Sequence, residues 1–141
     1  MAAGKATAAR SQGHFTLAAD TVVAVGSRIL PKAEDAVQVR ACLTLLSGRR
    51  HHVITAVTLI DPAGHVSHRV VDTAVIMTRL SHDQLEAYIA CEEGLGKAGG
   101  YAIQGRAAAL IRQIGGSYSG VVGLPLFETA QLLRGRGYPV P

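Results

Sequence analysis

The sequence predicts a single α/β domain in which helices flank a mixed β-sheet. Its 141 residues fit one domain. Hydrophobic residues make up 48% and aromatic residues only 4%, so the core must be aliphatic, which suits a sheet covered by helices. Strand-like runs also alternate with segments of helical periodicity. Because hairpins join antiparallel strands and helical crossovers join parallel ones, a mixed sheet is expected.

Four elements are expected in the first third of the chain. Residues 2–10 are typical of the end of a helix. The run from Phe15 to Val25 is apolar and β-branched, as in a strand buried on both faces. A turn then leads into a short strand, Arg28–Leu30. From Ala33 to Leu46 the apolar residues recur at spacings of three and four, which predicts a helix, and Gly48 follows as a left-handed cap.

A hairpin and a second helix are predicted next. The runs His52–Ile60 and Val66–Thr78 are joined by Asp61-Pro62-Ala63-Gly64, which has the proline and glycine of a type I turn. Ser81 and Gln84 then form a capping-box pattern that opens a helix to about Ala90.

The remaining third is expected to alternate glycine-rich loops with regular elements. Its segments are an irregular loop over 94–105, a strand over 107–114, a loop over 115–120, a helix over 124–134 and a loose tail over 135–141. No linker or repeat divides the chain, so residues 1–141 are expected to form one domain.

Composition narrows the classes of function. No apolar run approaches the length of a membrane span, and Cys42 and Cys91 are lone thiols, so a cytoplasmic protein without membrane contact is expected. The net charge is +4, but the basic residues are scattered and follow no nucleic-acid-binding pattern. A small anionic ligand is therefore favoured over a nucleic acid polymer.

Asp20 is the first candidate for chemistry. An ionised carboxylate inside an apolar strand is costly to bury unless it is paired. It is either a strand-end aspartate capped by backbone N–H groups, or a metal ligand or general base at the carboxyl edge of the sheet. Thr21 would point to the opposite face of a regular strand, but near a strand end its hydroxyl could contact a ligand.

Two lysines and a glutamine lie in loops that could meet a nucleotide. Lys32 follows a short strand and is either a solvated loop residue or a phosphate contact. The segment 94–105 contains five glycines, which would let backbone N–H groups approach an anion. Lys97 there is a candidate phosphate contact, and Gln104 carries donor and acceptor groups that can read a base edge.

The histidines do not space like a metal site. His51 and His52 would point to opposite faces of a strand, and so would His65 and His68. No nucleophile elbow or Ser-His-Asp order is present, so covalent nucleophilic catalysis is not expected.

Five segments, in order, resemble motifs of the Maf family of nucleoside triphosphate pyrophosphatases. They contain the sequences ADTVV at 19–23, ILPK at 29–32, LSGRRHHVITAV at 46–57, GKAGGYAIQG at 96–105 and GSYSGVVGLP at 116–125. The resemblance covers nearly the whole chain.

This resemblance implies a Maf/Ham1-like fold and cleavage of dTTP- or UTP-type nucleotides to the monophosphate and pyrophosphate. By the same resemblance, Asp20 would activate the attacking water and bind a divalent cation, Mg²⁺ or Mn²⁺. Thr21 and Gln104 would help to select the base, and Lys32 and Lys97 would hold phosphates. A homodimer is a further possibility.

The sequence also departs from the family pattern. The family's first strand, with an S-x-S-P-R-R motif, and a following D-E motif do not appear before Asp20, so the domain is expected to lack its first strand and helix at the amino terminus. Pro31, Ala33, Gly96 and Gly120 replace the family's Gly, Pro, Asp and Asn. The alternative to an active enzyme is therefore a catalytically impaired Maf-like fragment or pseudoenzyme that acts, if at all, in binding or assembly.

Overall fold

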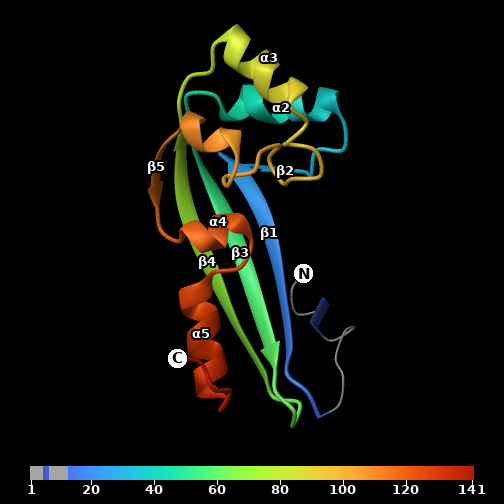
Figure 1. Cartoon of the computed structure of the whole chain (residues 1–141), viewed down its shortest axis with the longest axis vertical. Coiled ribbons are helices and arrows are strands. Elements are labelled where there is room, and N and C mark those ends of the chain that lie inside the picture. Colours follow the sequence, from blue (N-terminus) through green and yellow to red (C-terminus); the bar gives the residue numbers. More distant parts are fainter. Residues whose placement is uncertain (1–4, 7–12) are drawn as a thin grey trace.

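A computed structural model of the chain describes residues 5–6 and 13–141 and shows a five-stranded sheet with helices packed against it (Figure 1). The strand order is β2-β1-β3-β4-β5. The strands are β1 (Thr16–Val25), β2 (Arg28–Leu30), β3 (Arg50–Ile60), β4 (Val66–Met77) and β5 (Ile111–Gly115). The α-helices are α2 (Ala36–Leu46), α3 (His82–Ala90), α4 (Tyr118–Val122) and α5 (Leu126–Gly135), and η1 (Arg106–Leu110) is a 3-10 helix.

The α/β class is confirmed, but every strand pair in the described part of the chain is antiparallel. A mixed sheet was expected because α2 connects two strands as a crossover. Those strands, β2 and β3, do run parallel to each other, since each is antiparallel to β1. However, β1 lies between them, so no parallel pair forms.

The main hydrophobic core lies between α2 and one end of the sheet. Leu43 and Leu46 of α2 are fully buried with Val53, Val75 and Met77 of the strands. Burying a leucine or methionine side chain contributes about 1.5–3 kcal/mol, so this cluster fixes α2 on the sheet. A smaller cluster forms beneath α5 (Figure 1), where Leu132 packs with Val57 and Leu59.

The helix expected over Ala33–Leu46 begins later than predicted, at Ala36, whereas its predicted end at Leu46 is confirmed. Asp35 is the N-cap of α2, where its carboxylate accepts a hydrogen bond from the Gln38 backbone N–H at 2.8 Å. At the other end Gly48 has φ +68°, the left-handed conformation that glycine adopts without strain. Ser81 and Gln84 form the predicted capping box of α3.

The β3–β4 hairpin is also confirmed. Its turn is closed by a hydrogen bond of 2.9 Å from the Gly64 N–H to the Asp61 carbonyl, the bond between the first and fourth residues that is common in β-turns.

Two predictions for the carboxyl-terminal third are wrong. The strand expected over 107–114 begins only at Ile111, because Arg106–Leu110 forms η1. The Glu93 carboxylate accepts hydrogen bonds from the first two N–H groups of η1 and stabilises the helical turn. The loop expected over 115–120 contains the start of α4, whose N-cap Ser117 accepts from the Gly120 N–H.

Two further predictions concern the ends of the chain, namely a helix over 2–10 and a loose tail over 135–141. The helix expected over 2–10 falls mostly outside the described residues. The two residues of this segment that the structure describes, Lys5 and Ala6, are helical. In the tail, the Tyr138 ring packs edge-on against Phe15, with ring centroids 5.1 Å apart.

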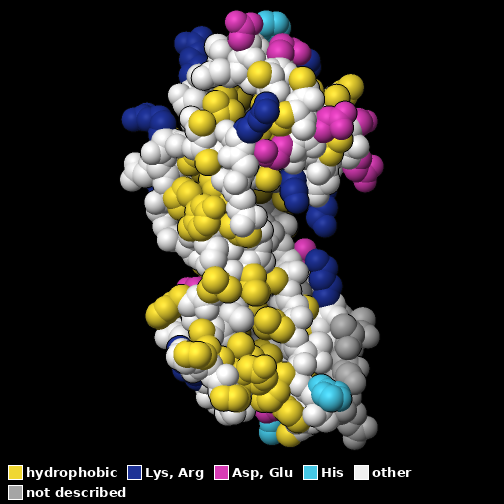
Figure 2. All heavy atoms as spheres, in the orientation of Figure 1, with side chains coloured by type: hydrophobic (Ala, Val, Ile, Leu, Met, Phe, Trp, Pro, Cys, Tyr) yellow, Lys and Arg dark blue, Asp and Glu magenta, His cyan; other side chains and the backbone are white. Residues whose placement is uncertain are grey.

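The surface near the carboxyl terminus is notably apolar. Figure 2 shows hydrophobic side chains gathered over the half of the molecule that α4 and α5 cover. Among them Leu126 and Phe127 are 61% and 69% exposed. Within the described part of the chain, no helix has both the length and the apolar character needed to cross a bilayer.

Candidate functional site

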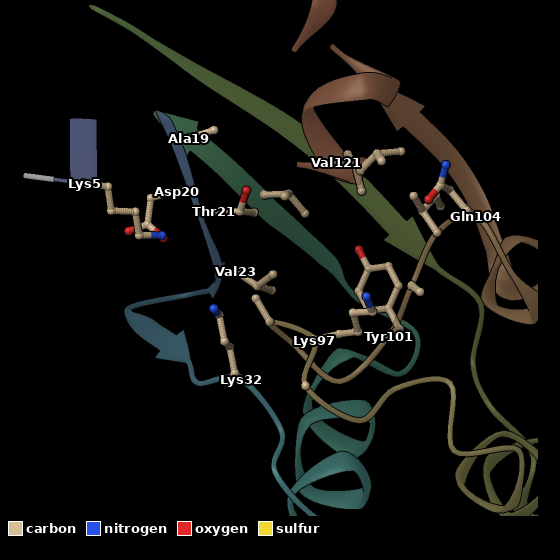
Figure 3. A pocket seen from close by; sticks show the side chains of 16 residues that line it. Lys5, Ala19, Asp20, Thr21, Val23, Lys32, Lys97, Tyr101, Gln104 and Val121 are labelled. Atoms are coloured by element: carbon tan, nitrogen blue, oxygen red, sulfur yellow. The ribbon is translucent and has the colours of Figure 1, made fainter. Parts of the chain in front are cut away.

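A cavity of about 250 Å³ opens beside β1, and it is lined by all five residues that the sequence nominates: Asp20, Thr21, Lys32, Lys97 and Gln104. They come from three separate segments of the chain, namely β1, the loop after β2 and the glycine-rich segment 94–105 (Figure 3). The charged side chains of this lining are Asp20 and three lysines, the third being Lys5. The cavity is therefore positive overall and suits an anion.

Asp20 lies in the middle of β1, so its expected position at a strand end is wrong. The strand continues to Val25 because it pairs with β3 along its length. The site lies instead at the lateral edge of the sheet. Among the described residues, β2 pairs with β1 only from Val23 onward, so the cavity reaches the outer edge of β1 next to Asp20.

Lys5 holds the Asp20 carboxylate in its charged form. Its Nζ donates a hydrogen bond of 2.9 Å to Asp20 Oδ1, and the Asp20 side chain is 26% exposed. This hydrogen bond lowers the pKa of Asp20 and outweighs the opposing effect of partial burial. Asp20 is thus ionised at neutral pH, as a proton acceptor or metal ligand must be. No sequence motif indicated Lys5, because it is distant from Asp20 in the chain and its segment was recognised only as the end of a helix.

Backbone pairing between two loops brings Lys32 and Lys97 to the same cavity. The Ala33 N–H donates to the Lys97 carbonyl at 3.1 Å, and the Gly96 N–H donates to the Ala33 carbonyl at 2.6 Å. Lys32 itself forms an isolated antiparallel bridge with Ala98. These main-chain hydrogen bonds fix the backbone at Lys32 and Lys97, so both lysine side chains start beside the cavity.

The glycine-rich segment 94–105 is packed closely against the domain. A Cβ at Gly94 would lie 2.1 Å from the Gly100 carbonyl oxygen, and one at Gly105 would lie 2.1 Å from Glu93 Oε2. The Gly100 oxygen is backbone and cannot move aside, so glycine is required at position 94 for steric reasons. At position 105 the Glu93 carboxylate would have to shift and give up its hydrogen bond to the Arg106 N–H. The sequence interpretation had assigned these glycines to anion approach, but close packing of the segment accounts for these two.

A buried hydrogen bond ties the same segment to β3. His51 Nε2 lies 2.6 Å from the Tyr101 hydroxyl, and both side chains are buried. Burial, with a smaller effect of the neighbouring His52, lowers the pKa of His51 to about 4, so the ring is neutral at pH 7. Tyr101 also lines the cavity. The His51–Tyr101 pair therefore fixes one wall of the site to the sheet.

The Thr21 hydroxyl belongs to a second polar network. Thr21 Oγ1 lies 3.0 Å from Oγ1 of Thr55, its cross-strand partner in β3. Thr55 is fully buried and donates a hydrogen bond of 2.8 Å to the Gly120 carbonyl of α4. When a buried acceptor loses its donor the cost is about 1–3 kcal/mol, so this arrangement fixes the Thr55 proton. Sequence reasoning had assigned no role to Thr55, although it lies in the segment 46–57 that resembles a family motif.

The alternation of side chains along β1 separates the two neighbouring candidates. Thr21 and Val23 point toward Val121 and Tyr101, whereas Asp20 points to the other side of the strand with Lys5 (Figure 3). A ligand that meets both Asp20 and Thr21 must therefore extend around the outer edge of β1. An elongated molecule with an anionic end and a hydrogen-bonding end fits this shape.

The fold and the site together define an α/β domain with a cationic cavity for an elongated anion. The Maf family model, described as Maf-like protein, matches residues 1–136, and the chain belongs to this family.

Several curated relatives agree with this assignment. A protein of Granulibacter bethesdensis named dTTP/UTP pyrophosphatase is 66% identical over 124 residues, which are 88% of this chain and 58% of that protein. Proteins with the same name from Paramagnetospirillum magneticum and Gluconobacter oxydans are 60% and 62% identical. The alignments cover 94% and 92% of this chain, and 70% and 61% of those proteins. The chain thus spans roughly 60–70% of the length of the relatives that it matches.

Proposed function

We propose that the chain hydrolyses nucleoside triphosphates such as dTTP and UTP to the monophosphate and pyrophosphate. The observation that carries this proposal is the meeting of Asp20 with two loop lysines, Thr21 and Gln104 around one cavity. The dTTP/UTP pyrophosphatase names of the relatives point to the same reaction. In it, water attacks the α-phosphorus, the bond from that phosphorus to the bridging oxygen breaks, and pyrophosphate leaves.

Asp20 is the proposed general base. It takes a proton from the attacking water as the new oxygen–phosphorus bond forms, which requires the ionised carboxylate that Lys5 favours. Lys32 and Lys97 would neutralise the negative charge of the triphosphate and of the leaving pyrophosphate. In phosphoryl-type displacements such charge neutralisation and positioning supply most of the rate enhancement.

A divalent cation fits this cavity only together with the substrate. The described residues contain no cluster of three or more potential protein ligands, and Asp20 is the one carboxylate of the cavity lining. Mg²⁺ is commonly held by one or two carboxylates plus substrate phosphates. We therefore propose that Asp20 and phosphate oxygens would share Mg²⁺ or Mn²⁺, which would supply further charge neutralisation.

A second candidate function is nucleotide binding without hydrolysis. It is favoured because Asp20 is the carboxylate that the described cavity lining supplies, so it would have to serve both as base and as metal ligand. A cytoplasmic location, a homodimer, and a lack of binding to membranes and nucleic acid polymers remain predictions.

The deciding experiment measures pyrophosphate release from dTTP and UTP with Mg²⁺ or Mn²⁺. We compare the unmodified chain with Asp20→Asn and with Asp72→Asn, a control at an exposed position of β4 that pairs with half-buried His52 and does not line the cavity. Loss of a general base lowers the rate by about 10²–10⁴-fold, so Asp20→Asn should lose nearly all release and Asp72→Asn should lose none. Equal release by all three proteins would remove Asp20 from this role. Nucleotide binding without release by the unmodified chain would support the second candidate.

A further inference from the structure

The direction of one hydrogen bond decides what Thr21 can offer to a ligand. A hydroxyl group has a single proton to donate and two lone pairs with which to accept. Thr55 gives its proton to the Gly120 carbonyl at 2.8 Å, because a carbonyl oxygen can only accept. The contact of 3.0 Å between the two threonine hydroxyls must then be a donation from Thr21 to Thr55.

The Thr21 hydroxyl is therefore left with lone pairs alone to face the cavity. Its proton is directed into the protein, toward fully buried Thr55, while the side chain itself lines the cavity wall. Any ligand atom that hydrogen-bonds to Thr21 must consequently be a donor.

We propose that Thr55 is a positioning residue that sets base specificity. It fixes the Thr21 hydroxyl as a hydrogen-bond acceptor, so the site favours bases that present an N–H group to Thr21. This inference rests on the proposed function, in that the ligand is a nucleotide whose base reaches Thr21. Thymine and uracil carry N3–H between two carbonyl groups and satisfy the fixed acceptor. Cytosine has a lone pair at N3, which would oppose the lone pairs of Thr21.

Gln104 cannot provide this discrimination by itself. Its side chain is exposed, and a rotation of its amide exchanges the donor and acceptor ends. Gln104 can thus adapt to the edge of either pyrimidine. The threonine pair cannot, because reversal of the Thr21–Thr55 bond would withdraw the donor from a buried carbonyl. The threonine pair therefore discriminates between the bases, and the Gln104 amide adapts to the base that is bound.

The test compares Thr55→Val with Thr55→Ser. Valine keeps the shape of threonine but removes the acceptor for Thr21, whose hydroxyl can then turn its proton toward the ligand. Serine keeps the hydroxyl and should retain the selectivity. Thr58→Val is the matched control, because Thr58 is a buried threonine of the same strand that does not line the cavity.

The measurement is the affinity for the α,β-imido analogues of dUTP and dCTP, which resist hydrolysis, followed by kcat/KM for dTTP and dCTP. We expect Thr55→Val to lower the preference for the uracil over the cytosine nucleotide by about tenfold or more. Thr55→Ser and Thr58→Val should keep the preference of the unmodified chain. An unchanged preference in Thr55→Val, or an equal loss in Thr55→Ser, would overturn the inference.

A second measurement needs no variant, so it stands even where Thr55→Val fails to fold. The unmodified chain should bind the triphosphate analogue of N3-methyluridine at least tenfold more weakly than that of uridine, because methylation removes the donor. Equal binding would overturn the inference. Selective binding of the uracil nucleotide without pyrophosphate release would refute the proposed hydrolysis but leave the role of Thr55 standing. Hydrolysis with a base preference that Thr55→Val leaves unchanged would support the proposed function and refute the role of Thr55.

Discussion

The buried histidine of β3 should make the stability of the domain fall as the solution becomes mildly acidic. In the folded protein the pKa of His51 is about 4, compared with an ordinary value of 6.5, because burial disfavours the charged ring. As the pH falls through 6.5 the unfolded chain takes up a proton that the folded chain refuses. Unfolding is therefore favoured progressively between pH 6.5 and pH 4, and the effect is absent well above pH 6.5.

The size of this effect follows from the two pKa values. A gap of about 2.5 pH units, at about 1.4 kcal/mol per unit, gives a total of about 3.5 kcal/mol well below pH 4. Between pH 6.5 and pH 5 the loss should be about 1.5 kcal/mol. This narrower window is the useful one, because carboxylates with lowered pKa values, such as those of Asp20 and Glu93, act at still lower pH.

Urea unfolding followed by circular dichroism at pH 6.5, 5.8 and 5.0 measures this loss. His51→Gln should be less stable at every pH, since it disturbs the contact with Tyr101. Between pH 6.5 and pH 5, however, it should lose about 1.5 kcal/mol less of its unfolding free energy than the unmodified chain does. His68→Gln, at an exposed position of β4, is the control and should retain the full dependence. The same pH dependence in His51→Gln as in the unmodified chain would refute the reasoning.

Two further predictions concern the walls of the cavity. Gly105→Ala places a methyl group against the Glu93 carboxylate, which should break the hydrogen bond to the Arg106 N–H and lower the free energy of unfolding by about 1–3 kcal/mol. Gly115→Ala, where a Cβ meets no atom within 4 Å, is its control in urea unfolding, and equal stability of the two variants would contradict the packing argument. Lys5→Ala should raise the pKa of Asp20, since the Lys5 hydrogen bond is the main cause of its lowering. The acid limb of the kcat/KM profile should then move to higher pH, and a limb that stays in place would show that Asp20 is not the group that titrates there.

Local patterns in the sequence predicted most of the elements well. Gly48 and the Ser81–Gln84 pair each act on backbone groups within a few residues, so the sequence around them suffices to place a helix end. The turn at Asp61–Gly64 is equally local.

The failures depended on contacts between distant residues. The insertion of β1 between β2 and β3, which makes the described sheet antiparallel, is decided by strand pairing across the whole domain. The 3-10 helix at Arg106 depends on the carboxylate of Glu93, which lies thirteen residues earlier in the chain.

In the candidate site, too, local sequence identified some residues, and contacts between distant residues decided the rest. Family motifs nominated the five residues that line one cavity, but the motifs did not show which residues support them. Lys5 reaches Asp20, and Thr55 reaches Thr21, only through tertiary structure. The position of Asp20 at the lateral edge of the sheet likewise follows from where the pairing with β2 ends.

The central claim is that one nucleoside triphosphate occupies the cavity beside β1. The most direct test records backbone and side-chain NMR shifts while the α,β-imido analogue of dUTP is added to the isotopically labelled chain. The largest changes should fall on Asp20, Thr21, Lys97 and Gln104, while Leu110, in a separate shallow cavity beside α3, should stay unchanged. Changes centred on that second cavity, or no saturable change at Thr21 and Gln104, would contradict the account.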